Sequence, residues 1–94
     1  MSYALEYSRR AERDLLRVPR EYVDLVEDHL VRLANSPASL SRPGAFPYPE
    51  NCQLYQFQLD IPGAVYSFVV LFRYFADEQT LWVLGIGHGE MPTE

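Results

Sequence analysis

The sequence predicts an α+β fold with the element order β-α-α-β-β-β, in which a helical hairpin packs on a mainly antiparallel four-stranded sheet. Residues 64–89 hold two apolar runs, rich in β-branched and aromatic side chains, on either side of a polar break at 77–79. Such runs are typical of an antiparallel hairpin. Residues 8–34 carry apolar side chains at helical spacing on both sides of Pro19. Two helices joined so tightly form a hairpin whose apolar stripe must cover a sheet face.

The first expected element is a short, half-buried strand at residues 3–7, where Tyr3, Leu5 and Tyr7 share one face. Ser8 follows at the position of a helix N-cap. Its hydroxyl can accept a hydrogen bond from one of the first free amides of a helix. The strand therefore leads directly into the helical hairpin.

Each of the two helices shows an apolar face. Ala11, Leu15 and Val18 lie on one side of the first helix, and Pro19 ends it because the residue before a proline leaves the α region. The same proline suits the first turn of the second helix. That helix has apolar side chains at steps of three and four residues, at Val23, Val26, Leu30 and Leu33. Residues 35–37 end it.

The remaining strands lie in the second half of the chain. Residues 35–50 form the densest Pro/Ser/Gly stretch and are expected to be an ordered surface loop. A strand with one polar face follows at 53–59, and 61–63 turn into the central hairpin. The first arm of that hairpin is apolar on both faces, as in a strand covered on both sides. Since too few residues follow Gly89 for another element, we expect a single domain over residues 1–94.

The charge is acidic and uneven. Eight arginines and no lysine oppose 13 acids, which gives a net charge of −5. Six of the arginines lie before Asn35, and only Arg42 and Arg73 lie beyond it. Proteins that hold nucleic acid by phosphate contacts usually show a basic patch. The part of the chain from Asn35 onward, which holds most of the expected strands, lacks such a patch. This argues against tight, sequence-independent binding of RNA or DNA.

Three further features of the sequence indicate a cytoplasmic protein without membrane association. No apolar run approaches the roughly 18–20 residues needed to span a membrane, and the N-terminus lacks a signal pattern. Cys52 is the only cysteine, so an internal disulfide and a multi-cysteine metal site are excluded. No other clustered metal-ligand spacing is present, and no cofactor is expected.

The segment Gly85–Gly89 contains the principal candidate side chain, His88. A phosphate-binding loop would need a following helix, so we interpret the glycines as a strand end that leaves one face bare for close packing. His88 shares the alternation of Trp82 and Ile86 at the exit of the strand. A histidine there can act as a general base or acid near neutral pH, or simply pack without any chemistry.

Two other groups of charged residues have two interpretations each. Arg73 shares a face with Val69 and Leu71, where it can bind a phosphate or pair with the acids at 77–78. A stripe of arginines on the first helix forms either a solvated, partly self-neutralised face or a docking surface for an acidic partner. That stripe consists of Arg9, Arg13 and Arg17. His29 is expected to be a surface residue.

Several of these segments together resemble the RelE/ParE toxin superfamily. The strand at 3–7, the segment 8–15, the proline break and the end of the second helix at 33–37 are similar to the family's beginning. The segment 81–88, which ends in Gly-His, is similar to its last strand. The resemblance covers about residues 3–90 and implies the toxin half of a bacterial type II toxin–antitoxin pair, neutralised by an antitoxin that wraps it.

The resemblance implies two kinds of activity. RelE-like members cleave messenger RNA in the ribosome without a metal, whereas ParE-like members inhibit gyrase. The chain departs from the nucleases at Ser67 and at Gly89, where they usually carry basic residues. His88 matches a position at which some family nucleases hold a catalytic histidine. If the chain cleaves RNA, we expect His88 as the base and Arg73 or Arg42 as the cation near the phosphate.

Two functional hypotheses follow. In the first, the chain is a toxin that binds an antitoxin and cleaves messenger RNA on the ribosome through His88 and Arg73. In the second, it is a non-catalytic module that binds gyrase or another protein. The first is the favoured hypothesis, and the acidic second half of the chain and the missing cations motivate the second. A small-ligand domain unrelated to toxins is a third possibility for so short a chain.

Overall fold

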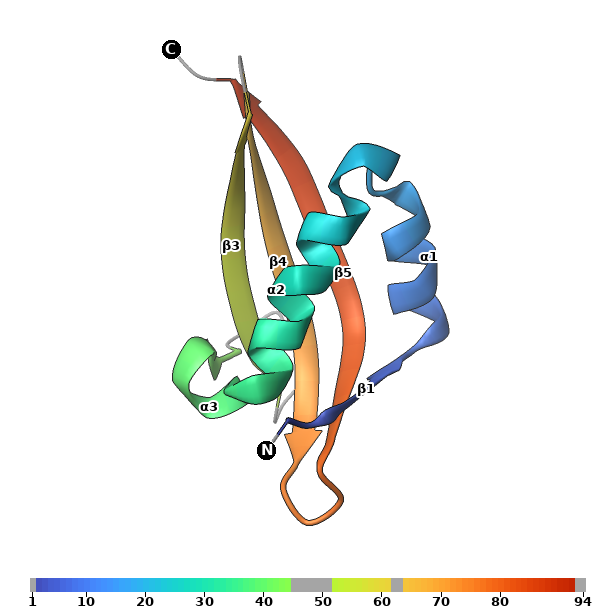
Figure 1. The fold of residues 1–94 in the computed structure, drawn as a ribbon, viewed down its shortest axis with the longest axis vertical. Helices are drawn as coiled ribbons and strands as arrows, with labels where there is room; N and C mark the ends of the chain where they lie inside the picture. Colours follow the sequence, from blue (N-terminus) through green and yellow to red (C-terminus); the bar gives the residue numbers. More distant parts are fainter. Residues whose placement is uncertain (1, 45–51, 62–63, 93–94) are drawn as a thin grey trace.

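The computed structural model describes residues 2–44, 52–61 and 64–92. Within them, helices α1 (Arg9–Arg17) and α2 (Val23–Asn35) lie on one face of a five-stranded sheet (Figure 1). The strands are β1 (Ala4–Tyr7), β2 (Arg42–Pro43), β3 (Gln53–Ile61), β4 (Ala64–Phe75) and β5 (Thr80–Pro92). Their order is β1-β5-β4-β3-β2, and only the β1–β5 pair is parallel. The α+β class and its helical hairpin are confirmed, with one strand more than expected.

Helix α1 begins where the sequence predicts. Ser8 has extended backbone angles, and its Oγ accepts a hydrogen bond from the Ala11 N–H at 3.0 Å. The helix ends at Val18, which is extended before Pro19 as the steric rule for pre-proline residues requires. Ala11 and Val18 are buried, so the predicted apolar face of this helix is confirmed.

The loop expected at residues 35–50 contains more regular structure than the sequence indicated. Pro37 occupies the first turn of a short helix, α3 (Pro37–Leu40), and residues 42–43 pair with β3. Proline lacks an N–H that the first helical turn would leave unused, so a proline-rich segment can begin a helix. A short 3-10 helix, η1 (Arg20–Tyr22), precedes α2. The rest of that loop, 45–50, and part of the turn predicted at 61–63 lie outside the described residues.

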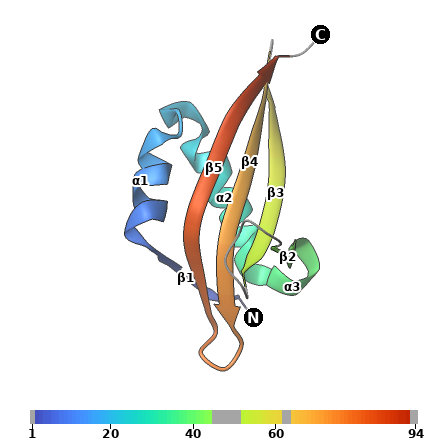
Figure 2. The ribbon, with the colours of Figure 1, turned by 180° about the vertical axis from the view of Figure 1, so that it is seen from behind.

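The hydrophobic core lies between the helices and one face of the sheet. Alternate side chains of β4, Phe68, Val70 and Phe72, are fully buried there. The opposite face of the sheet is crossed by neither α1 nor α2 (Figure 2). Val69 and Leu71 on that face are half-buried. The expectation that β4 is covered on both faces was therefore wrong, because both helices lie on the same side.

A β-bulge divides β5 into two halves. Leu71 pairs with Gly85 but the next residue of β4, Phe72, pairs with Val83, so Leu84 is an extra residue. An extra residue reverses the alternation of faces beyond it. Val83 and Ile86 consequently both face the core. The strand then continues to Pro92, past the end at Gly89 that the sequence suggested.

The single cysteine lies at the start of β3. Cys52 is 1% exposed, and its carbonyl accepts a hydrogen bond from the Gly44 N–H at 2.8 Å. This contact holds the β2 segment against β3. None of the described helices is long and apolar enough to cross a membrane. Nor do three or more His, Cys, Asp or Glu side chains gather as metal ligands in the described ranges.

Candidate functional site

His88 lies in the second half of β5, beyond the end of the pairing between β1 and β5. It pairs with Phe68 across the β4–β5 ladder and therefore shares the helix-bearing face. Its ring centroid is 5.6 Å from that of Phe68. Phe68 is fully buried whereas His88 is exposed. The imidazole thus stands on the rim of the core with its polar atoms available to solvent.

The bulge separates His88 from Trp82, which the sequence had placed on the same face. Trp82 pairs with Arg73 and lies on the face that the helices leave open, with 39% of its surface exposed. His88 lies on the other face. The shared alternation inferred from the sequence was wrong, because it assumed an unbroken period of two across Leu84.

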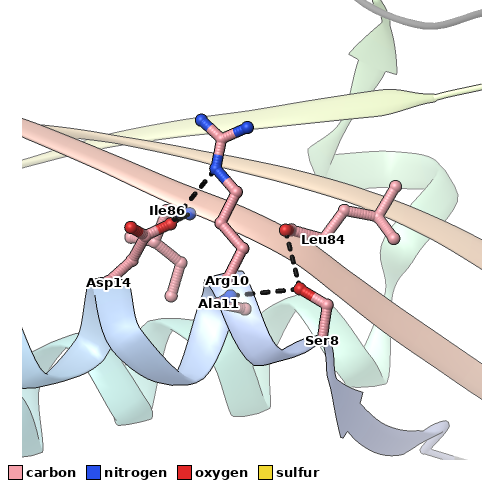
Figure 3. Close-up of polar contacts among 6 residues, drawn as sticks. All are labelled: Ser8, Arg10, Ala11, Asp14, Leu84 and Ile86. Carbon is pink, nitrogen blue, oxygen red and sulfur yellow. Dashed lines mark hydrogen bonds and ion pairs between the residues drawn. The ribbon is translucent and has the colours of Figure 1, made fainter.

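Side chains of α1 take the place of a neighbouring strand where β1 stops. β1 pairs with β5 only up to Val83. Beyond it, Ser8 Oγ donates to the Leu84 carbonyl at 2.8 Å, and an Asp14 carboxylate oxygen accepts from the Ile86 N–H at 2.9 Å (Figure 3). A charge-assisted hydrogen bond to a backbone amide is among the stronger ones in proteins. The helix therefore holds this part of β5 in place.

Asp14 also holds a guanidinium group beside the strand. Arg10 Nε lies 3.9 Å from an Asp14 carboxylate oxygen, and the two side chains are 80% and 14% exposed respectively. A Cβ atom at Gly85 would lie 3.4 Å from Arg10 Nε and 3.6 Å from an Asp14 carboxylate oxygen, so these side chains pack against the glycine. Gly87 and Gly89 have no such neighbours. Close packing, which the sequence suggested for all three glycines, occurs at Gly85.

These groups surround an open depression of about 270 Å³ between α1 and β5. It is lined by Arg10, Asp14, Arg17, Ile86, Gly87 and His88. The site thus combines two guanidinium groups, one carboxylate and one imidazole. Cations next to a proton-transferring side chain are the groups that phosphodiester chemistry uses when charge develops on phosphate oxygens.

Neither of the two arginines expected beside His88 lies near it. Arg73 pairs with Trp82 and lies on the opposite face of the sheet from His88. It is also five residues along β4 from Phe68, or about 16 Å at the usual rise of a strand. Arg42, on β2 at the far edge of the sheet, donates a hydrogen bond to Gln56 Oε1 at 2.7 Å. The structure does not bring the expected pair together.

The arginines that line the depression together with His88 come from α1 instead. Arg10, Asp14 and Arg17 are spaced by four and three residues, which places them on one helical face. That spacing is visible in the sequence. What the sequence did not reveal is that this face borders the free edge of β5. Arg10 pairs with Asp14 of the same helix, and this contact supplies part of the self-neutralisation expected for the helix.

His29 is not the surface residue that the sequence suggested. Its ring stacks on Phe57 with centroids 4.0 Å apart, and its Nδ1 lies 2.7 Å from the Tyr55 hydroxyl. Burial lowers the pKa of His29, and Arg32 lowers it further against the opposing effect of Asp28. The stacked, neutral imidazole joins α2 to β3. Its role in the structure is packing, away from the depression at His88.

The fold is similar to that of chains in solved structures from bacterial toxin–antitoxin systems. The chain resembles a chain of the Mycobacterium tuberculosis RelBE2 toxin–antitoxin complex, with 18% identity, a TM-score of 0.77, and 95% of this chain and 93% of that one covered. It also resembles a chain of the intact Escherichia coli RelBE complex, with 16% identity, a TM-score of 0.65, and coverage of 96% and 100%. The isolated E. coli RelE toxin gives 18% identity, a TM-score of 0.67, and coverage of 96% and 87%. At these identities the similarity shows the fold alone.

The family follows from the sequence match. Residues 5–92 match the model of the ParE toxin of the type II toxin–antitoxin system parDE. The chain belongs to this family. No curated protein matches the chain at a significant level. The resemblance inferred from the opening strand, the helical hairpin and the final Gly-His is therefore confirmed.

Proposed function

We propose that the chain is a toxin that cleaves messenger RNA on the ribosome, and that an antitoxin binds and neutralises it. The observation that carries the proposal is the depression in which the exposed His88 lies together with Arg10 and Arg17. The family match supports the toxin role, and the solved relatives in complex with antitoxins support the partner. The ribonuclease role rests on the side chains around the depression.

The proposed reaction uses the 2′-hydroxyl of the RNA as nucleophile. His88, as general base, removes the 2′-hydroxyl proton while the 2′-oxygen attacks the adjacent phosphorus. The bond from phosphorus to the 5′-oxygen breaks, which leaves a 2′,3′-cyclic phosphate and a 5′-hydroxyl. Arg10 and Arg17 offer positive charge to the phosphate oxygens as their negative charge increases. The Asp14 carboxylate positions the Arg10 guanidinium. The same carboxylate positions β5 by accepting a hydrogen bond from the Ile86 N–H.

The proton for the departing 5′-oxygen has no separate donor around the depression. In-line attack places the leaving 5′-oxygen on the side of the phosphorus opposite the 2′-oxygen. One imidazole therefore cannot both remove the proton from the 2′-hydroxyl and protonate the 5′-oxygen. The lining residues include no second side chain that titrates near neutral pH. A group of the ribosome is therefore proposed to complete the reaction, and naked RNA is expected to be a poor substrate.

The test is translation-coupled cleavage of messenger RNA by the purified chain. We expect ribosome-dependent cleavage that falls by about 10²-fold or more in His88→Ala, the usual contribution of a general base. Arg10→Gln and Arg17→Gln are expected to lower the rate, whereas Arg13→Gln is the matched control, since Arg13 is on the same helix but does not line the depression. Unchanged cleavage in a folded His88→Ala variant would exclude His88 as the base.

A second candidate function is inhibition of gyrase, or binding of another protein, without catalysis. The match to the ParE family model favours it. For this activity we propose the sheet face without helices, where Arg73 and the exposed Trp82 pair side by side. A gyrase supercoiling assay distinguishes the two. Inhibition that persists in His88→Ala and is lost in Arg73→Ala with Trp82→Ala would support the protein-binding function and contradict the ribonuclease.

A further inference from the structure

The two helices of the hairpin carry opposite net charges. Helix α1 has four arginines against two acids, whereas α2 has three acids against one arginine. The helices lie side by side on the same face of the sheet and border a common depression (Figure 1). A basic strip and an acidic strip therefore run next to each other on the outer surface of the hairpin.

The depression between the helices is open and mainly apolar, with a volume of about 370 Å³. It is lined by Leu15, Leu16, Val18, Arg20, Val23 and Glu27. The side chain of Leu16 is the most exposed large hydrophobic one in the described part of the chain, at 85%. Single exposed apolar side chains are normal, but apolar side chains that gather around a depression mark an interaction surface.

The charged residues on the two sides of this depression differ in sign. On α1, Arg9, Glu12 and Arg13 lie within the two turns before the exposed leucine, at spacings that share its side of the helix. On α2, Glu27 lines the depression and Asp24 lies one turn before it. All five side chains are exposed. The α1 rim is thus mainly basic, and the α2 rim is acidic.

A surface with these two rims is complementary to a second copy of itself. In a dimer with two-fold symmetry both copies use the same patch, and each contact between unlike residues occurs twice. When α1 of one copy packs on α2 of the other, a basic rim meets an acidic rim at two places. Packing of α1 on α1, or of α2 on α2, would bring like charges together, which disfavours it. Charge complementarity therefore selects one arrangement.

We infer that the outer face of the α1–α2 hairpin binds a second copy of the chain in a two-fold dimer. Leu16 of each copy enters the depression of the other, and Arg13 lies beside the partner's Glu27. A helix of 13 residues is only about 20 Å long, so the contact area is near the lower limit for specific interfaces. We therefore expect a weak dimer with a Kd in the micromolar range. The depression at His88 lies on the β5 side of α1 and stays open.

The first test is the oligomeric state of the purified full chain. Sedimentation velocity over the micromolar range should give a mass that rises with concentration from 10.9 kDa toward twice that value. Leu16→Glu removes the apolar contact and places an acid near the partner's Glu27, so we expect Kd to rise at least about tenfold. Leu25→Glu is the matched control, because Leu25 is exposed on α2 but does not line the depression. Circular dichroism establishes that each variant is folded.

A second test uses two charge-reversed chains in one solution. Arg13→Glu and Glu27→Arg each bring like charges together twice in their own dimer, so each variant alone should associate more weakly than the native chain. In a mixed dimer both contacts pair opposite charges again. We therefore expect the equimolar mixture to associate more tightly than either variant alone. An effect confined to the fold of one chain would not give this result, because it would be unchanged by mixing.

Three outcomes would overturn the inference. One is a chain that stays monomeric throughout the micromolar range. Another is a dimer with equal Kd values in Leu16→Glu and Leu25→Glu, or without preferential association of the two charge-reversed chains, because its interface would lie elsewhere. The third is a monomeric chain that co-purifies with the product of the neighbouring open reading frame and loses that protein in Leu16→Glu. This result would assign the hairpin face to that protein instead.

Discussion

The two halves of β5 differ in what surrounds them. Residues 80–83 lie between β1 and β4, and Leu81 and Val83 are fully buried. Beyond the bulge, β5 has β4 on one side only, side chains of α1 replace the other neighbour at Leu84 and Ile86, and His88 is exposed. One strand thus lies between two other strands in its first half and has an open edge in its second half. The extra residue, Leu84, marks the boundary.

A pair of alanine variants compares the two halves directly. Leu81→Ala creates a cavity in the buried half and should cost about 3 kcal/mol, as is typical of a buried leucine. His88→Ala removes an exposed side chain and should change stability by less than about 0.5 kcal/mol. Thermal or urea unfolding measures both. Equal losses in the two variants would mean that the second half is as tightly integrated as the first.

A smaller loss of stability is expected from substitution of Asp14, whose side chain takes the place of a neighbouring strand beside Ile86. Asp14→Ala leaves the Ile86 N–H without its acceptor and should cost about 1–2 kcal/mol. Asp14→Asn retains an acceptor oxygen and should cost less. Hydrogen exchange of the Ile86 amide gives the local measure, with faster exchange in the alanine variant than in the asparagine variant. Identical exchange in both would contradict the role of the carboxylate in holding the strand.

The smallest change in stability is expected from His29, which joins α2 to β3 away from β5. Because burial and Arg32 lower the pKa of His29 in the folded chain, the unfolded chain binds more protons between the folded pKa and the free value of about 6.5. The contribution of His29 to stability is therefore complete above pH 6.5 and lost as the pH falls through the folded value. Urea unfolding between pH 8 and 5 should show this loss, and His29→Gln should reduce it. An equal pH dependence in the variant would assign it to other groups.

Much of the fold could be predicted because local signals and tertiary needs agree. Ser8 caps α1, Pro19 separates the helices, and the spacing of Val26, Leu30 and Leu33 places the α2 stripe in the core. The short elements α3 and β2 were missed because their four and two residues carry no periodic pattern. The bulge was missed because an extra residue in an apolar strand leaves no trace in composition.

The site was predictable only in part. A histidine at the end of a Gly-rich strand was visible as a candidate, and its exposure agrees with that interpretation. The arginines beside it were not, since they come from a helix more than 70 residues earlier in the chain. Their proximity depends on β1 stopping at Tyr7 and leaving a gap that α1 fills. Such an arrangement is a property of the edge of a sheet and has no local sequence signal.

The buried thiol of Cys52 gives this chain a built-in reporter of opening. A thiol with 1% exposure reacts with a bulky disulfide reagent only when its surroundings move apart. Since it is the sole cysteine, its labelling rate needs no correction for other sites. It lies directly before β3, on the far side of β4 from the toxin's exposed histidine. A change at the β5 edge that leaves the labelling rate unaltered has therefore loosened that edge alone, whereas faster labelling signals opening that reaches across the sheet.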